Sequence, residues 1–245
     1  MHNAALRALG LDWLYLPVPI PPALFADTVR ALPGSGFHGV NVTVPHKEAA
    51  HDLADESSAA VAAIGAANTL TFDGGVTRAE NTDAGGLIDA LGHLPRGLRA
   101  LVLGAGGSAR AAAWALREAG ADVSVCNRTP TRARTLASEL EVRYVGQPGP
   151  SDLLVHCTSV GLDPSTSVAQ AIETLGLGGL DPPPTVVDLV YNNTETPVAA
   201  WARSGGARVV EGTEVLVRQG ARSLELWTGS PAPVAEMRAA VQRQG

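Results

Sequence analysis

The stretch Leu101-Val-Leu-Gly-Ala-Gly-Gly-Ser-Ala-Arg110 decides the fold of this chain. Residues 98–103 form a short apolar run, which predicts a buried parallel strand. Gly104, Gly106 and Ala109 then match the spacing G-x-G-x-x-G/A, and the alanine-rich segment that follows predicts a helix. In this pattern the glycines permit a tight turn and the close approach of a pyrophosphate to the backbone. The predicted cofactor-binding residues are those of the turn and the first helical turn, whose free N–H groups attract phosphate: Gly104, Ala105, Gly106, Gly107, Ser108 and Ala109.

The end of the next predicted strand, Asp122–Cys126, indicates which dinucleotide binds. In an NAD site this strand is usually followed by an Asp or Glu that binds the ribose 2′-hydroxyl. Here Asn127-Arg-Thr129 follows and contains no acid, while Arg128 and Arg132 suit a 2′-phosphate because guanidinium groups match phosphate oxygens. For Arg134 a solvated helix face is the favoured interpretation. We therefore expect NADP rather than NAD, although the glycine pattern alone leaves open a plain strand–helix turn.

Strands and helices alternate through the middle of the chain. Strands are predicted near residues 98–103, 122–126, 142–145, 152–157 and 184–189, with helical segments between them, including 168–175. This alternation predicts a parallel, doubly wound sheet of the Rossmann type. Nearer the N-terminus, helices are predicted at 2–9, 22–32, 48–53, 57–64 and 84–91, and strands at 13–16 and 39–45, with a turn into a strand at 65–71. Two final helices, 214–227 and 231–242, are expected to return to the N-terminal domain.

The predicted fold class is therefore α/β with two domains. Residues 1–83 together with 213–245 would bind the substrate, and residues 84–212 would bind NADP.

Composition excludes several classes of protein. The chain has 245 residues, a net charge of −6 and 45% hydrophobic residues, which is typical of a globular protein and argues against a nucleic-acid partner. No apolar stretch approaches the length of a membrane span, and no secretory signal is recognisable, so we expect a cytoplasmic protein. Cys126 and Cys157 are predicted to be small core residues, and no Cys/His cluster has metal-ligand spacing. The expected partner is a small molecule, and the chain is expected to be a monomer or a homodimer.

Short polar side chains gather at predicted strand ends in the first third of the chain: Asn41, Thr43, Lys47, Asn68, Asn81 and Asp83. Each has a structural interpretation alone, such as an edge position, a surface lysine, a turn residue or a helix cap. Together they fit a polyhydroxylated ligand, which needs several hydrogen-bonding groups on a rigid scaffold. A lysine paired with an aspartate is suited to moving a hydroxyl proton during hydride transfer.

A series of short motifs follows in order along the chain: Asn41-Val-Thr-Val-Pro-His-Lys47, Ile64-Gly-Ala-Ala-Asn-Thr-Leu70, Asn81-Thr-Asp83, Gly104-Ala-Gly-Gly-Ser-Ala109, Asn127-Arg-Thr129, Thr158-Ser-Val-Gly161, Asp188-Leu-Val-Tyr191 and Gly212-Thr-Glu-Val-Leu-Val-Arg-Gln-Gly-Ala221. In this order they resemble the motifs of shikimate dehydrogenases. The resemblance covers essentially the whole chain, and so many ordered motifs are very specific. It implies the reversible, NADPH-dependent reduction of 3-dehydroshikimate to shikimate, a step in chorismate and aromatic amino acid biosynthesis.

The resemblance also implies a role for individual residues. Lys47 and Asp83 match the catalytic pair, and which of them carries the proton stays open. The substrate-binding positions are Asn41, Thr43, Lys47, Asn68, Asp83, Tyr191 and Gln219. The 2′-phosphate positions are Asn127, Arg128, Thr129 and Arg132, and the positions on the nicotinamide side are Thr158, Ser159, Leu189 and Gly212. Tyr191 and Leu189 also have a pure packing interpretation.

This chain departs from the family pattern at its start. Family members begin with a strand and a Gly-x-Pro…His-Ser-x-Ser-Pro segment, whose hydroxyls hold the substrate carboxylate, ahead of the helix that here begins with Met1-His-Asn3. The missing strand is expected to leave neighbouring strand edges unpaired. We therefore expect the natural protein to start upstream of Met1, and the present chain to bind NADP better than shikimate. An intact mass equal to that of residues 1–245 would contradict this expectation.

Two other functions compete with shikimate reduction. A relative acting on quinate or aminoshikimate is a close alternative, but NAD-using quinate relatives tend to carry an acid near Asn127, which is lacking here. The other is a non-catalytic NADP(H)-binding relative that has lost its carboxylate-binding segment, and the retained Lys47 and Asp83 count against it.

Overall fold

A computed structural model of the chain describes residues 1–191 and 194–243. The chain divides into two compact units. The first unit contains Met1–Gly86 and the C-terminal stretch that begins at Val217, and the second unit contains Leu87–Leu216.

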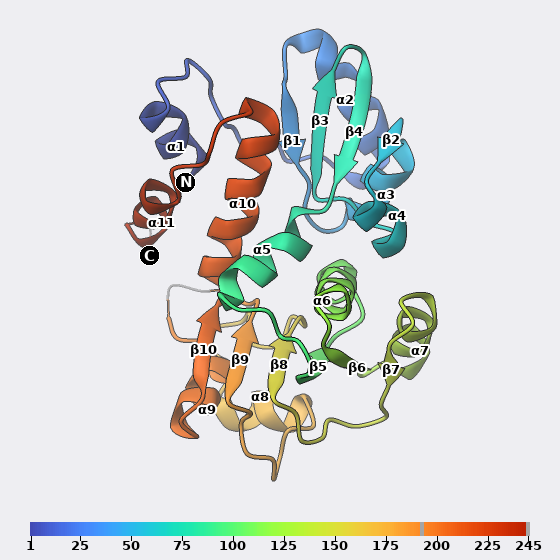
Figure 1. The fold of residues 1–245 in the computed structure, drawn as a ribbon, viewed down its shortest axis with the longest axis vertical. Helices are drawn as coiled ribbons and strands as arrows, with labels where there is room; N and C mark the ends of the chain where they lie inside the picture. Colours follow the sequence, from blue (N-terminus) through green and yellow to red (C-terminus); the bar gives the residue numbers. More distant parts are fainter. Residues whose placement is uncertain (192–193, 244–245) are drawn as a thin grey trace. The chain divides into compact units, whose positions relative to one another are not determined.

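The second unit is a six-stranded parallel sheet with the strand order β10-β9-β8-β5-β6-β7 (Figure 1). This order is that of the doubly wound dinucleotide-binding fold, as predicted. The strands are β5 (Arg99–Leu103), β6 (Asp122–Cys126), β7 (Arg143–Tyr144), β8 (Leu153–His156), β9 (Thr185–Asp188) and β10 (Arg208–Glu211). The helices between them are α6 (Gly107–Glu118), α7 (Pro130–Glu139), α8 (Val168–Thr174) and α9 (Pro197–Ser204).

Successive residues of these strands point to opposite faces of the sheet, and each face has its own core. Val102 of β5 belongs to a cluster with Ala112 and Leu116 of α6, whereas its neighbour Leu101 belongs to a cluster with Val198 of α9. A sheet covered on both faces explains why its strands read as continuous apolar runs in the sequence.

The first unit contains a four-stranded mixed sheet with the order β1-β3-β4-β2. Its strands are β1 (Gly39–Asn41), β2 (Glu56–Ser57), β3 (Thr69–Asp73) and β4 (Val76–Glu80). One core joins this sheet to Phe25, Ala50 and Val61 of three helices. The helical elements around it are η1 (Pro22–Leu24), α2 (Phe25–Ala31), η2 (Pro33–Ser35), α3 (Lys47–Leu53) and α4 (Ala59–Ile64).

Three further helices come from the two ends of the sequence: α1 (His2–Ala8), α10 (Gly212–Thr228) and α11 (Val234–Gln242). Leu6, Leu224 and Met237 share a buried cluster, so the C-terminal helices pack with the N-terminal one, as predicted. The indole N–H of Trp227 in α10 donates a hydrogen bond to the carbonyl of Leu70 in β3 at 3.1 Å. The return of the chain therefore also ties α10 to the sheet of the first unit.

Several elements were not predicted. The hairpin of β3 and β4 turns at Gly74 and Gly75, which both have positive φ, and the Asp-Gly-Gly stretch was an available signal for it. The short strand β2 takes Ser57, which was expected to start a helix, and Ser58 instead caps α4 by accepting from the N–H of Val61. Helix α9 and the edge strand β10 were also missed.

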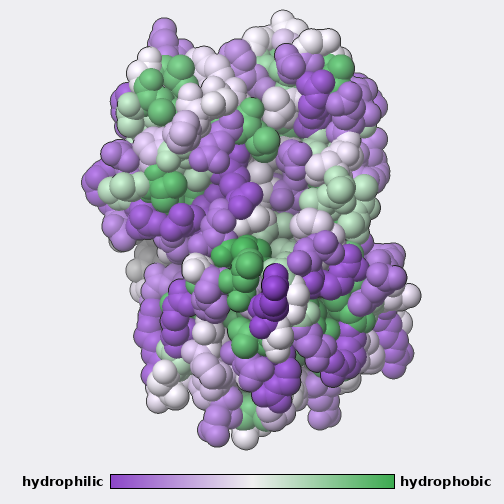
Figure 2. Space-filling view, viewed as in Figure 1, coloured by the Kyte–Doolittle hydropathy of each residue, from purple (hydrophilic) through white to green (hydrophobic). Residues whose placement is uncertain are grey.

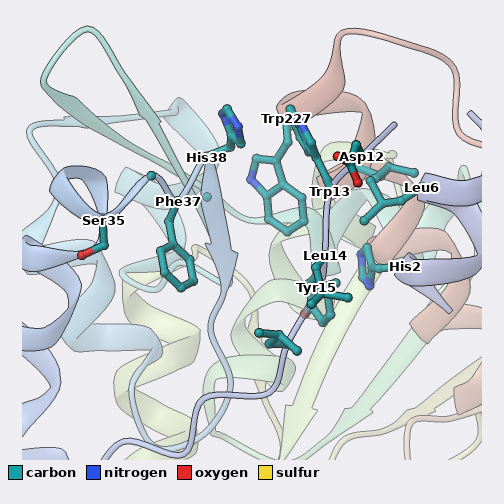
Figure 3. A pocket seen from close by; sticks show the side chains of 14 residues that line it. His2, Leu6, Asp12, Trp13, Leu14, Tyr15, Ser35, Phe37, His38 and Trp227 are labelled. Atoms are coloured by element: carbon teal, nitrogen blue, oxygen red, sulfur yellow. The ribbon is translucent and has the colours of Figure 1, made fainter. Parts of the chain in front are cut away.

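The strand predicted at Trp13–Leu16 is wrong, since none of these residues pairs with a sheet. The side chain of Asn3 bonds both backbone groups of Tyr15, accepting from its N–H at 2.7 Å and donating to its carbonyl at 2.9 Å. The side chain of Asn3 thus makes the two backbone hydrogen bonds that a neighbouring strand would otherwise make to Tyr15. The segment lines a pocket of about 300 Å³ with Phe37, Gly39 and Trp227 (Figure 3).

The strand predicted at 39–45 is shorter than expected, because β1 ends at Asn41 and Val44 is 72% exposed. Strand β1 lies at the edge of its sheet. The carbonyl of His38 accepts from the N–H of Phe72, and the N–H of Val42 donates to the carbonyl of Asn68. Backbone groups alternate in direction along a strand, so the N–H and C=O groups of Gly39 and Asn41 point away from β3.

On the face shown in Figure 2, hydrophilic side chains predominate and hydrophobic ones form separate small groups. Within the part of the chain that the structure describes, no helix is both long and apolar enough to cross a bilayer.

Two adjacent glycines of α5 (Thr82–Leu91) test how closely this helix packs on α10. A Cβ on Gly86 would lie 2.7 Å from the backbone nitrogen of Gln219, whereas the three atoms nearest to a Cβ on Gly85 all belong to the guanidinium end of Arg222. We expect Gly86→Ala to lower the free energy of unfolding by roughly 1–3 kcal/mol, because backbone must shift. Gly85→Ala is the matched control, since it gains the same helix propensity of about 1 kcal/mol and displaces only a flexible side chain. Equal urea stability of the two variants would contradict this packing.

Candidate active site

Lys47 and Asp83 form an ion pair in the first unit. Lys47 is the first residue of α3 and Asp83 is the second residue of α5, so residues distant in sequence meet at the start of two helices. The Lys47 Nζ lies 2.6 Å from Asp83 Oδ2, and the two side chains are 12% and 22% exposed. This limited exposure keeps both groups accessible to a small ligand while reducing the screening of their charges by water.

Asn68 lies beside this pair and is 2% exposed. Its Nδ2 is 2.9 Å from Asp83 Oδ1 and 3.2 Å from Gln219 Oε1, and its Oδ1 accepts from the backbone N–H of Thr82 at 2.7 Å. One amide therefore connects the start of β3 to both α5 and α10. Asp83 is oriented at both oxygens, since Lys47 bonds one and Asn68 the other.

Asn81 has a structural role at the start of α5. The side-chain oxygen of Asn81 accepts from the N–H of Ala84 at 3.2 Å, which is a helix cap, and its Nδ2 donates to the carbonyl of Ala66. The capping group of α5 is thus Asn81, and Asp83 remains directed at Lys47.

Three buried hydroxyls adjoin this cluster and were not identified from the sequence. Thr69, Thr82 and Ser223 have Oγ atoms 3.0–3.2 Å from one another. The Nδ2 of Asn41 lies 2.8 Å from Ser223 Oγ and 3.1 Å from Thr69 Oγ1. Asn41 therefore belongs to the same network as Asn68, since both contact the hydroxyl triangle. Thr82 lies inside the recognisable Asn81-Thr-Asp83 motif, whereas no sequence signal pointed to Ser223.

Tyr15 extends the network toward α1. Its hydroxyl donates to Asn41 Oδ1 at 3.0 Å, and burial raises the pKa of the phenol, which keeps it a neutral donor. The ring of Tyr15 stacks on His2 at 4.2 Å between centroids. Burial lowers the pKa of His2 to about 4, so at neutral pH the imidazole is uncharged and its Nε2–H donates to the carbonyl of Gly220.

Of the predicted substrate-binding residues in this unit, the structure brings together Asn41, Lys47, Asn68, Asp83 and Gln219. Thr43 is exposed, and among the described residues its side chain makes no hydrogen bond to this cluster. Tyr191 belongs to the second unit and is 52% exposed, so its role stays a prediction.

The glycine turn of the second unit has the backbone that a dinucleotide requires. Gly104 has a φ of +126°, and a Cβ on it would lie 3.0 Å from the carbonyl oxygen of Cys157, so only glycine fits. Gly106 precedes α6 in an extended conformation, and a Cβ there would meet nothing within 4 Å. The N-terminus of a twelve-residue helix with no acid in its first turn is thus open to an anion. These residues fit the pyrophosphate of NADP.

The residues after β6 present positive charge. Arg128 and Arg132 are exposed, and within residues 1–191 and 194–243 no acid is described as pairing with either. Asn127 donates from Nδ2 to the carbonyl of Thr129, which fixes the turn that carries Arg128. The guanidinium of Arg134 instead lies over the ring of Tyr144, 4.9 Å from its centroid. Arg134 therefore has a packing partner, whereas Arg128 and Arg132 remain suited to a phosphate.

The residues predicted for the nicotinamide side follow strands β8, β9 and β10. Thr158 accepts from the N–H of Val160, Ser159 is exposed, and Leu189 packs against the core of the second unit. Gly212 begins α10, and a Cβ on it would lie 2.8 Å from the carbonyl oxygen of Leu189. Glycine is therefore required at this contact by packing alone.

Comparison with known proteins identifies the family. Family models match three parts of the chain: the shikimate dehydrogenase substrate binding domain at residues 1–70, shikimate / quinate 5-dehydrogenase at 90–149, and the shikimate 5'-dehydrogenase C-terminal domain at 212–242. The shikimate dehydrogenase (NADP(+)) of Methanothermobacter thermautotrophicus is 40% identical over 259 residues, covering 99% of this chain and 90% of that protein.

Solved structures show the same relationship. Shikimate 5-dehydrogenase from Thermus thermophilus, crystallised with NADP(H) and shikimate, has a TM-score of 0.87 and 40% identity, covering 99% of this chain and 92% of the other. The ligand-free 5-ketofructose reductase of a Gluconobacter species has a TM-score of 0.85 and 28% identity, covering 99% and 92%. From the matched domains and the identity over nearly its whole length, the chain belongs to the shikimate dehydrogenase family.

Proposed function

We propose that this protein is an NADP-dependent shikimate dehydrogenase that reduces 3-dehydroshikimate to shikimate reversibly. The observation that carries the proposal is the Lys47–Asp83 pair at 2.6 Å, with Asn68 bonded to the second carboxylate oxygen. The relatives support both the substrate and the cofactor, since they are NADP(+)-dependent shikimate dehydrogenases.

The chemistry assigned to the pair follows from its charges. Reduced NADP, when bound, supplies a hydride to the ketone carbon of the substrate. The oxygen of that ketone gains negative charge and needs a proton donor within hydrogen-bond reach. The ammonium of Lys47 provides both the charge and the proton, and Asp83 keeps the ammonium in place and accepts from a ring hydroxyl. In the reverse direction the pair takes the hydroxyl proton.

The polar network suits a polyol rather than an apolar ligand. Asn68, just before β3, Gln219 of α10 and Asn41 of β1 provide amide groups, and the hydroxyls of Thr69, Thr82 and Ser223 behind them restrict their rotation. A rigid set of short polar groups distinguishes ring hydroxyls strongly, because a substrate lacking one would leave a buried group unpaired. We propose Thr43 and Tyr191 as additional substrate contacts.

The proposed setting is the cytoplasm, with small molecules as ligands. A net charge of −6 supports small-molecule rather than nucleic-acid binding, because nucleic-acid partners require a basic surface.

The direct test is NADPH formation from NADP⁺, followed by absorbance, with shikimate as substrate and quinate as control. We expect activity with shikimate. Preference for quinate would favour the alternative dehydrogenase, and NADP⁺ binding without turnover of either substrate would favour a non-catalytic NADP-binding relative.

Replacing the lysine tests the catalytic assignment. We expect Lys47→Ala to lower kcat by about 100-fold or more, the range of a lost general acid, while NADP⁺ affinity stays nearly unchanged. Glu48→Ala is the control, because Glu48 is the exposed next residue of the same helix and contacts none of the cluster described above. Initial rates and NADPH fluorescence titration measure the two quantities. Wild-type turnover in Lys47→Ala would refute the assignment.

Replacing the arginine after β6 tests the cofactor preference. Arg128→Ala is expected to raise the KM for NADP⁺ by roughly 10- to 100-fold, because hydrogen bonds to a charged group contribute about 1.5–3 kcal/mol. The KM for NAD⁺, which lacks the 2′-phosphate, should not change. Arg134→Ala is the control, since its guanidinium is committed to Tyr144. An equal rise for both nucleotides would contradict 2′-phosphate recognition.

A further inference from the structure

A buried chain of an acid, an imidazole and a hydroxyl ends beside the glycine turn. His156 is the last residue of β8 and stands opposite Asp188, the last residue of β9, and they are 0% and 1% exposed. His156 Nδ1 lies 2.8 Å from Asp188 Oδ1, and His156 Nε2 lies 2.6 Å from Thr158 Oγ1. No role was predicted for His156 from the sequence.

The partners of Asp188 determine which ring nitrogen carries the proton. Asp188 Oδ1 also accepts from the N–H of Val190, and Oδ2 accepts from the hydroxyl of Thr196 at 2.5 Å. Both oxygens thus accept from other donors, and the imidazole nitrogen that faces Oδ1 at 2.8 Å must also donate, because two acceptors at that distance would repel each other. The proton of a neutral His156 is therefore on Nδ1, and Nε2 is an acceptor.

This tautomer sets the direction of the Thr158 hydroxyl. Because Nε2 accepts, the hydroxyl of Thr158 donates to it. The same oxygen accepts from the N–H of Val160 at 3.1 Å. A hydroxyl has one donor and two acceptor sites, so one lone pair of Thr158 remains. Thr158 is partly exposed and thus presents an acceptor with a fixed orientation.

The position of Thr158 connects this hydroxyl to the nucleotide site. The preceding residue, Cys157, donates its N–H to the carbonyl of Leu103, and its own carbonyl packs against Gly104 at the start of the glycine turn. Thr158 thus follows β8 at the same carboxyl edge of the sheet as the turn after β5, where ligands of such sheets bind.

We propose that His156 is a positioning residue for the NADP site: held by Asp188, it fixes Thr158 as a hydrogen-bond acceptor toward the bound nucleotide. The inference rests on the proposed function in one respect, the placement of Thr158 on the nicotinamide side. It assigns the buried pair a task beyond stability, because a packing role would not require the second imidazole nitrogen to reach an accessible hydroxyl.

The first test measures the tautomer in the ligand-free protein. Protein labelled with ¹⁵N at histidine distinguishes the protonated from the bare ring nitrogen by their chemical shifts, and His156→Asn assigns the signal. We expect a proton on Nδ1 and none on Nε2. A proton on Nε2 would overturn the proposal, because Thr158 could then no longer donate to that nitrogen.

The second test uses two matched substitutions. Asparagine places its amide near the position of Nδ1, so His156→Asn keeps a donor for Asp188 and removes the partner of Thr158. Glutamine places its amide near Nε2, so His156→Gln keeps the partner of Thr158 and takes the donor from Asp188. A merely structural role predicts damage mainly from His156→Gln, whereas our proposal predicts nucleotide effects mainly from His156→Asn.

The readouts are the Kd for NADP⁺, the KM for shikimate and the melting temperature. We expect His156→Asn and Thr158→Val each to raise the Kd by about three- to tenfold, the range of one hydrogen bond, with the KM for shikimate unchanged. The double variant should equal Thr158→Val alone, since one residue acts through the other. His156→Gln should lower the melting temperature and keep the Kd.

The outcomes separate this inference from the proposed function. If the unmodified protein binds NADP⁺ and Thr158→Val weakens that binding but His156→Asn does not, the role of His156 is refuted and the proposed function stands. Additive effects in the double variant refute it equally. If the unmodified protein does not bind NADP⁺, the proposed function fails first and this inference fails with it.

Discussion

The buried amide of Asn68 is the constraint on which the candidate active site depends. At 2% exposure an unpaired amide is costly, so α5 and α10 must supply partners where β3 begins. These partners are groups of Asp83, Thr82 and Gln219, of which Asp83 and Gln219 are also proposed substrate contacts. The contacts that stabilise the first unit would then also set the proposed binding geometry, and the helices that carry them are held close by Gly86.

In the second unit the parallel sheet itself places the predicted cofactor-binding residues. Parallel strands deliver all their carboxyl ends to one edge, so the turns after β5, β6 and β8 meet there without any long loop. Gly104, Arg128 and Thr158 lie in those three turns. The strands themselves can therefore be apolar and form the core. Among the described residues of this unit, the buried polar side chains are those of His156, Asp188 and Thr196.

Most elements predicted from the sequence have a local cause, although the hairpin of β3 and β4 was missed despite its local Asp-Gly-Gly signal. The glycine turn and the strand Asp122–Cys126 follow from short-range patterns and were confirmed by the parallel sheet. The Trp13–Leu16 strand failed because Asn3, ten residues upstream of it, took over the backbone of Tyr15. Ser223 and His156 could not be recognised, since their partners are set by packing and register rather than by spacing. Lys47 and Asp83 were candidates as polar residues at predicted strand ends, and the resemblance to a known family gave them their catalytic role.

The two occupied oxygens of Asp83 restrict how this site can change by single substitutions. Asparagine is the closest neighbour of aspartate in shape, yet its amide has one acceptor atom instead of two. Either orientation of that amide would turn an NH₂ group toward a donor, the ammonium of Lys47 or the amide of Asn68. An asparagine at position 83 would thus be tolerated only if Lys47 or Asn68 changed at the same time. The donors around Asp83, rather than the space available there, restrict this substitution.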